Sequence, residues 1–130
     1  MNKIDTLIAY LFAIQAFAKD IHYSASGEAF YSKHLLADEI YKGIDEQIDA
    51  LIETCILPYG FPKQIDEYWS DAKGIIPSTC DFKNLKLLIT DALDYINEEL
   101  PNGERGAQAL IDNIAQDLQR KLGLITRQVG

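Results

Sequence analysis

Apolar residues recur every three to four positions between Ile4 and Ile21, which is the spacing that lines one face of an α-helix. This pattern predicts a helix over roughly residues 3–23. Its apolar positions are Ile4, Leu7, Ile8, Leu11, Ile14, Phe17, Ala18 and Ile21. Turn and cap residues follow over 24–27, and they predict a break before the next helix.

The same periodicity resumes after the break and predicts a second helix from about Glu28 to Ile56. Its apolar positions are Leu36, Ala37, Ile40, Ile44, Ile48, Leu51 and Cys55. We expect this helix to be continuous over about 29 residues, or roughly 43 Å at 1.5 Å per residue. Pro58, Gly60 and Pro62 predict its end.

The second half of the chain predicts a crossover over 57–79, with a short helix in KQIDEYWSDAKG (63–74), followed by two more long helices. Asp81 is the expected cap of the first, and Pro101 to Gly103 form a turn before the second, over about 104–127. Their apolar positions are Leu85, Leu88, Ile89, Ala92, Ile96 and Leu100, then Ala107, Leu110, Ile111, Ile114, Leu118, Leu122 and Ile125. No segment alternates as a strand would. We therefore expect an all-α fold, a ferritin-like four-helix bundle with one long crossover.

Composition narrows the class of protein. A chain of 130 residues with 48% hydrophobic residues suits one globular domain, 1–130. Its net charge of −8 argues against general electrostatic binding to nucleic acid.

The apolar N-terminal stretch contains Asp5 and is periodic, so we interpret it as a core helix and not as a signal peptide. No apolar run is long enough to span a bilayer. Cys55 and Cys80 lack metal-type spacing, so we expect reduced thiols in a cytoplasmic protein.

A polar stripe follows the predicted second helix. Its members are His34, Asp38, Asp45, Asp49 and Glu53. At about 100° per residue they share one side of a continuous helix, within roughly 100° of arc. A solvated acidic face is the plain interpretation of such a stripe. The alternative is a metal site, in which Asp45 would be a supporting or dimer-contact group and not a ligand.

The spacing of these residues indicates how a metal site could form. His34 and Asp38 are one turn apart, and so are Asp49 and Glu53, but the two pairs are centred about 22 Å apart along one helix. They would meet if the helix crossed a second copy antiparallel about a two-fold axis, which is the commonest symmetry of protein dimers. The midpoint lies beside Gly43, whose missing side chain would let two backbones come close.

His22 would complete such a site, because folding the first helix back onto the second places it near His34. Two imidazoles and three carboxylates suit Fe²⁺, Mn²⁺ or Zn²⁺ better than Ca²⁺. The sequence has no Glu-x-x-His, the motif of di-iron sites inside a single bundle, so we expect the site to lie between subunits.

These residues resemble those of a known family. The pattern of His22, Tyr23, Gly27, Phe30, His34, Asp38, Tyr41, Ile44, Asp49 and Glu53 is similar to that of the Dps mini-ferritins, DNA-protection proteins of starved bacteria. The spacing His-x11-His-x3-Asp-x10-Asp-x3-Glu is that family's ferroxidase signature. The resemblance implies a hollow dodecamer that oxidises ferrous iron with hydrogen peroxide or oxygen, stores the ferric mineral and limits oxidative damage. It also implies that His22, His34 and Asp38 come from one subunit, and Asp49 and Glu53 from its mate.

The chain departs from that family in ways that change the expectation. Tyr23 stands where typical members have Trp, and no Lys-rich N-terminal tail precedes the first helix, so we do not expect DNA binding. Glu104, Asp112 and Asp117 are candidates for the acidic pores of such a shell, or ordinary solvated carboxylates. Two other classes of protein stay open. One is a non-enzymatic assembly protein on the same fold, compacting DNA or acting as a scaffold with a structural metal. The other is a helical interaction module.

Overall fold

The computed structural model describes residues 3–100 and 103–129. Every element that it assigns in these ranges is helical, which confirms the all-α class. The elements are α1 (Lys3–Ser24), α2 (Phe30–Tyr41), α3 (Ile44–Leu51), the π-helix η1 (Ile52–Ile56), α4 (Ile65–Lys73), α5 (Phe82–Glu99) and α6 (Arg105–Val129).

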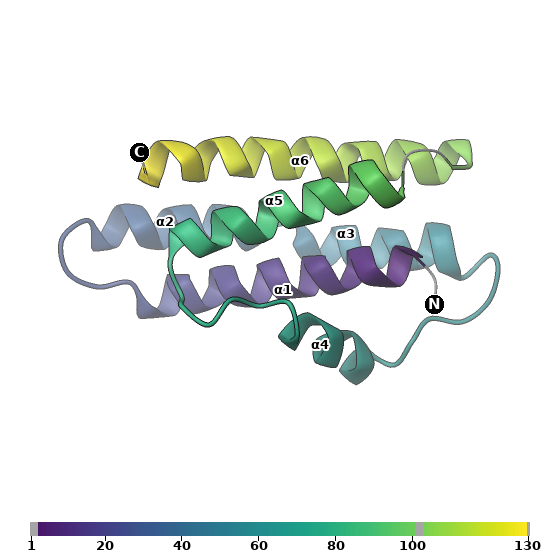
Figure 1. Cartoon of the computed structure of the whole chain (residues 1–130), viewed down its shortest axis with the longest axis horizontal. Coiled ribbons are helices and arrows are strands. Elements are labelled where there is room, and N and C mark those ends of the chain that lie inside the picture. The colour runs from purple at the N-terminus through teal and green to yellow at the C-terminus, as the bar shows by residue number, and fades with distance from the viewer. Residues whose placement is uncertain (1–2, 101–102, 130) are drawn as a thin grey trace.

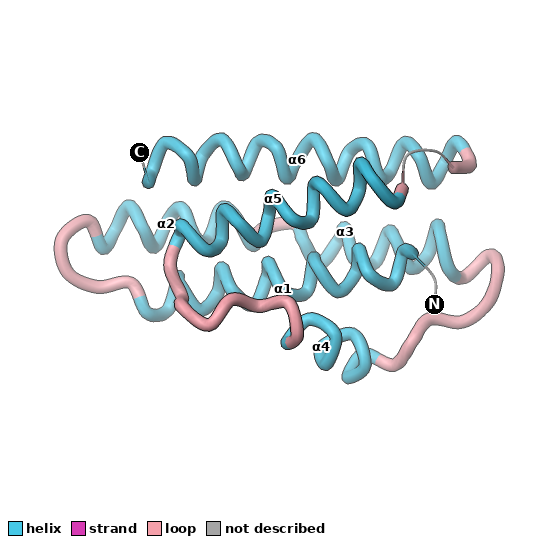
Figure 2. Tube along the Cα trace, viewed as in Figure 1, coloured by secondary structure: helices cyan, strands magenta, loops and turns pink. Residues whose placement is uncertain are grey.

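The long helices run along the long axis of the molecule (Figure 1). α2 and α3 follow one another along that axis, α1 packs against both of them and against α5, and α6 packs against α5 and the α2–α3 pair. The α1–α2 loop lies at one end, and the loop after η1 lies at the other (Figure 2). This arrangement places the start of α2 and the end of η1 at opposite ends of the molecule.

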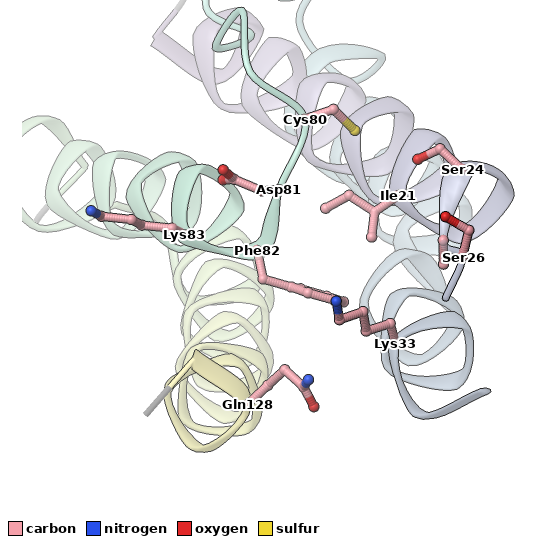
Figure 3. Close-up of a pocket in the computed structure, with 10 residues that line it drawn as sticks. Ile21, Ser24, Ser26, Lys33, Cys80, Asp81, Phe82, Lys83 and Gln128 are labelled. Carbon is pink, nitrogen blue, oxygen red and sulfur yellow. The ribbon is translucent and has the colours of Figure 1, made fainter. Parts of the chain in front are cut away.

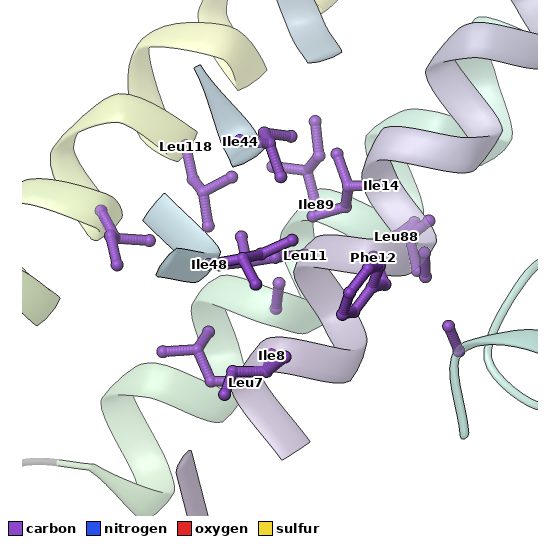
Figure 4. Packing of buried hydrophobic residues seen from close by; sticks show 14 of the residues in the cluster. Leu7, Ile8, Leu11, Phe12, Ile14, Ile44, Ile48, Leu88, Ile89 and Leu118 are labelled. Carbon is purple, nitrogen blue, oxygen red and sulfur yellow. The ribbon is translucent and has the colours of Figure 1, made fainter. Parts of the chain in front are cut away.

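The core joins α1, α3, α5 and α6 (Figure 4). Leu11 of α1, Ile44 of α3 and Leu118 of α6 are all completely buried. The predicted apolar positions of α1 are buried as well, except that Ile4 is partly exposed and packs against the core. Each large aliphatic side chain of this kind contributes about 1.5–3 kcal/mol when it is withdrawn from water.

The crossover helix α4 is attached to α1 by both polar and aromatic contacts. The buried Tyr68 hydroxyl donates a hydrogen bond to Asp5 Oδ1 over 2.7 Å. Phe12 packs on Trp69, with 4.7 Å between the ring centroids. Tyr68 and Trp69 therefore attach the crossover helix to the bundle. After α4 the chain returns to α5, where Asp81 caps the helix by accepting a bond from the Asn84 amide at 2.8 Å, as predicted.

The prediction of one continuous helix over 28–56 is wrong. Lys42 has φ −62° and ψ 131°, and Gly43 has φ 82° and ψ −6°. These are the angles of a type II turn, whose third residue must be left-handed and is therefore usually glycine. Helical periodicity survives such a turn, since the apolar positions on both sides still face the core. Gly43 thus ends α2 instead of lying within a helix, and the segment closes with a π-helical turn over Ile52–Ile56.

Two further features bear on the class of protein. Among the residues described, no helix combines the length and apolar character needed to cross a membrane. Cys55 is a buried free thiol and Cys80 an exposed one.

Candidate functional site

The two histidines lie against each other where α1 ends and α2 begins. Their ring centroids are 3.6 Å apart, and the rings are nearly parallel at 22°. His22 Nδ1 is 2.9 Å from the His34 carbonyl oxygen, and His34 Nδ1 is 2.9 Å from the His22 carbonyl oxygen. Because a carbonyl oxygen only accepts, each Nδ1 carries the proton and donates. In the neutral ring, each Nε2 then carries the lone pair, and this is the form in which histidine binds metals.

Aromatic side chains enclose this histidine pair. Phe30 stacks on His34 with 5.3 Å between centroids and 28° between planes. Tyr23 and Tyr41 meet His22 edge-on, at 5.3 Å and 5.5 Å. These contacts restrict rotation of the imidazoles and so orient both Nε2 atoms. Sequence reasoning assigned Phe30 and Tyr41 no separate role, although Phe30 precedes His34 by one helical turn, the spacing at which side chains on a helix meet.

Asp38 lies one turn after His34 on α2 and is partly buried. A hydrogen bond to the Asp38 side chain, together with burial, raises the pKa of Tyr41 to about 12. The Tyr41 hydroxyl therefore stays protonated and donates to the carboxylate. Hydrogen bonds of this kind orient ligating carboxylates in metal sites.

Asp49 and Glu53 lie beyond the turn at Gly43, in α3 and η1, and both are exposed. In the ranges 3–100 and 103–129, no group of three or more His, Cys, Asp or Glu residues is close enough to hold a metal ion. A single chain thus brings His22 and His34 together, with Asp38 on the next turn, and leaves the other two predicted ligands on a separate segment. Completion of the site by a second copy stays a prediction.

Asp45 has a partner within its own chain. Gln15, a buried residue of α1, donates from Nε2 to Asp45 Oδ1 over 2.5 Å. This bond ties α3 to α1. It gives Asp45 a structural role, distinct from the ligand role predicted for Asp49 and Glu53.

The three pore candidates also have partners within the chain. Glu104 accepts a hydrogen bond from the Tyr59 hydroxyl, and Asp112 accepts one from Gln108 Nε2 at 2.8 Å. Burial raises the pKa of Asp117, but hydrogen bonds from Lys121 and Gln47 outweigh it and hold that pKa below its ordinary value. A role for these carboxylates in a pore stays a prediction.

A pocket of about 420 Å³ lies close to the histidine pair, between the end of α1 and the start of α5. Ile21, Lys33 and Cys80 line it, but neither histidine does (Figure 3). Although Cys80 is an exposed residue, partial desolvation of its thiol and the nearby Asp20 carboxylate raise the pKa of the thiol, so it is a weak nucleophile at neutral pH. The candidate site is therefore the histidine pair beside the pocket.

No family model, curated protein or solved structure matched the chain.

Proposed function

We propose that this chain is a Dps-type mini-ferritin subunit with a ferritin-like four-helix bundle. It oxidises ferrous iron with hydrogen peroxide or oxygen and stores the ferric product inside a hollow cytoplasmic shell of about twelve copies. The observation that carries the proposal is the reciprocal bonding of His22 and His34, which leaves both Nε2 atoms outside these bonds, with Asp38 one turn further along α2.

The donors suit iron as a substrate. Imidazole nitrogens are borderline ligands and carboxylate oxygens are hard ones, and such mixed sites bind Fe²⁺, with Zn²⁺ and Mn²⁺ as competitors. His22, His34 and Asp38 would hold the ion from one subunit, and Asp49 and Glu53 from its mate. The carboxylates would also offset the positive charge that increases when the iron is oxidised.

The proposed reaction balances without a further co-reactant. Two ferrous ions each give one electron to one hydrogen peroxide, whose O–O bond breaks, and two protons complete two molecules of water. Delivery of both electrons at one site avoids release of hydroxyl radical. The part of this chain is to hold the ions in place and to fix the imidazole tautomers through the His22 and His34 carbonyls.

The surface around the histidines supports a second copy as the missing half of the site. Tyr23, Tyr31 and Leu35 are 76%, 69% and 49% exposed, so this hairpin presents several large side chains to solvent. Apolar patches of this kind commonly mark protein–protein contacts. A mate covering this hairpin would bury them and bring its own carboxylates to the histidines.

The test is iron oxidation under low oxygen. Ferrous iron and hydrogen peroxide are added, and the ferric absorbance is followed for the wild type and for a His34→Ala, Glu53→Ala double variant. We expect the double variant to lose at least tenfold in rate. A double change of exposed residues on α5 and α6, Glu98→Ala with Gln119→Ala, is the matched control and should keep the wild-type rate. Equal rates for the wild type and the site variant would refute the proposal.

Gel shift with duplex DNA separates this function from DNA compaction. The net charge of −8 predicts no retained complex at moderate salt, because non-specific binding depends on cationic contacts with phosphate. A complex that survives moderate salt would contradict that part of the proposal.

A further inference from the structure

α6 contacts both sides of the turn that separates α2 from α3. Before the turn, Arg120 pairs with Glu39 of α2 over 3.0 Å. At the turn, Lys121 Nζ donates to the Lys42 carbonyl oxygen over 3.1 Å. After it, Gln47 Nε2 of α3 donates to Asp117 Oδ2 over 2.8 Å. One helix thus binds the segment before, at and after the position where it bends.

Lys121 is the central member of this group. Its side chain is 0% exposed, and its ammonium lies 2.8 Å from Asp117 Oδ2. A buried charge is tolerated only when it is paired and hydrogen-bonded, and Lys121 has both an anionic partner and a carbonyl acceptor. The apolar stripe of α6 does not require a lysine here, since a Leu or Met would fill the same space.

The Lys42 carbonyl oxygen needs a hydrogen-bond donor in the turn, and the Lys121 ammonium supplies one. The last carbonyls of a helix have no partner within it. If residues 28–56 formed one continuous helix, the Glu46 amide would bond to the Lys42 carbonyl. In the turn that bond is absent, α3 begins with the Gln47 amide bonded to the Gly43 carbonyl, and Lys121 takes the free acceptor. Lys121 and the Glu46 amide are therefore alternative donors to one oxygen.

We infer that Lys121 and Asp117 form a clamp that holds the turn at Lys42–Gly43 and fixes the direction of α3 and η1 relative to α2. The consequence for chemistry rests on the proposed function. α2 carries His34 and Asp38, α3 and η1 carry Asp49 and Glu53, and the clamp sets the angle between the two halves that each chain offers to its mates.

A thermodynamic cycle tests the clamp without iron. Gly43→Ala is introduced into the wild type and into a Lys121→Met background, and Tm is measured for all four proteins. In the wild type, alanine must adopt φ 82°, and we expect a fall in Tm of about 4 °C. Without Lys121 the segment is free to become helical, where alanine is favoured over glycine, so the loss should shrink or reverse.

Two further backgrounds, each measured with and without Gly43→Ala, make the result decisive. Arg127→Met removes a cation from an exposed position on α6 and is the matched control, so Gly43→Ala should cost it the full wild-type loss. Asp117→Asn removes the counter-charge of Lys121 and should behave as Lys121→Met does. Hydrogen exchange at the Glu46 amide should slow in the Lys121→Met, Gly43→Ala protein as the helix closes. Equal losses of Tm in all backgrounds, with no change in that exchange, would overturn the inference.

Cobalt titration of the assembled protein separates this inference from the proposed function. With Co²⁺ as the probe, we expect Lys121→Met to bind about tenfold more weakly than Arg127→Met, because its half-sites are no longer held in register. Wild-type protein that binds no Co²⁺ at the histidines would count against the proposed function. Lys121→Met protein that binds as tightly as the control would show that the clamp does not set the site.

Discussion

His22 and His34 show how single backbone contacts decide the chemistry of a side chain. Each ring donates a hydrogen bond from Nδ1–H to the carbonyl oxygen of the other residue, and in the neutral ring the lone pair that could bind an ion is on Nε2. The spacing of the two residues across a hairpin predicted that they would meet. It could not predict the reciprocal bonds, because these depend on where the last turn of α1 and the first turns of α2 place two carbonyl groups.

Tyr68 gives a test of the polar contact between α4 and α1. Its hydroxyl donates to Asp5, both groups are buried, and Tyr68→Phe leaves the carboxylate without that donor. We expect a loss of about 1–3 kcal/mol in the free energy of unfolding, measured with urea. The control is Tyr95→Phe, whose hydroxyl bonds to the Lys3 carbonyl at an exposed place, and it should lose less. Equal losses would show that burial of the contact does not matter.

The same tyrosine predicts a response to alkali. Burial, with the bond to Asp5, raises the pKa of Tyr68 from 10.0 to about 12. Between these values the unfolded chain ionises while the folded chain keeps its proton, so stability falls as pH rises through this window. Tyr68→Phe removes the contribution, and its unfolding midpoint in urea should fall less between pH 10 and 12 than that of the wild type. An unchanged pH dependence would contradict the assignment.

At the scale of elements, the helices were predictable where their ends carry local signals. Asp81 caps α5 through its own side chain, and Ser24 to Gly27 interrupt the chain between α1 and α2. The bend at Gly43 was missed for a physical reason. Apolar periodicity reports which side of a segment faces the core, and that side is the same before and after the turn. A glycine within a helical pattern was the available signal. Lys121 of α6 is distant in sequence and contacts this turn only in the folded chain.

The cap of α5 gives a prediction for a single element. Asp81→Ala removes the acceptor of the Asn84 amide and should lower the free energy of unfolding by about 1 kcal/mol, as the loss of a helix cap commonly does. Thermal unfolding measures this loss. Asp94→Ala, an exposed carboxylate within the same helix, is the control and should change stability little. A cap variant as stable as the control would contradict the assigned role.

Acid should weaken the contact of α6 with α3. Hydrogen bonds from Lys121 and Gln47 hold the pKa of Asp117 below its ordinary value of 3.8 despite burial. The contribution of Asp117 is therefore present above that value and is lost as pH falls through the folded-state pKa. We expect the unfolding midpoint in urea to decline less between pH 5 and 2.5 in Asp117→Asn than in the wild type. Parallel declines would show that Asp117 is not part of the acid response.

At the scale of the whole molecule, one chain carries the five predicted ligands in two separate sets. The histidine set lies at the α1–α2 end, and Asp49 and Glu53 lie on α3 and η1 past the bend. The sequence predicted a separation along one continuous helix, whereas in the structure the turn at Gly43 divides the two sets. The direction in which each set points could not be predicted, because it depends on the turn at Gly43 and on the clamp from α6.

Assembly is the first consequence of this account. Twelve chains of 14.6 kDa would form a particle of about 175 kDa, and sedimentation equilibrium measures that mass directly. Tyr31→Lys with Leu35→Lys on the exposed hairpin should reduce the particle to smaller species. The control, Leu87→Lys on α5, changes an exposed apolar residue away from the hairpin and should leave the mass unchanged. A wild-type monomer would favour a helical interaction module over a storage shell.

Complementation between inactive chains tests the central claim, that each iron site is shared by two subunits. His34→Ala and Glu53→Ala chains are unfolded together in equal amounts, refolded, and assayed for iron oxidation with hydrogen peroxide. In a mixed dimer the Glu53→Ala chain supplies the histidines and the His34→Ala chain supplies the carboxylates, so one site in two is intact. Random pairing then predicts about a quarter of the activity of wild-type protein refolded in the same way. A mixture no more active than either variant alone, beside active refolded wild type, would contradict the account.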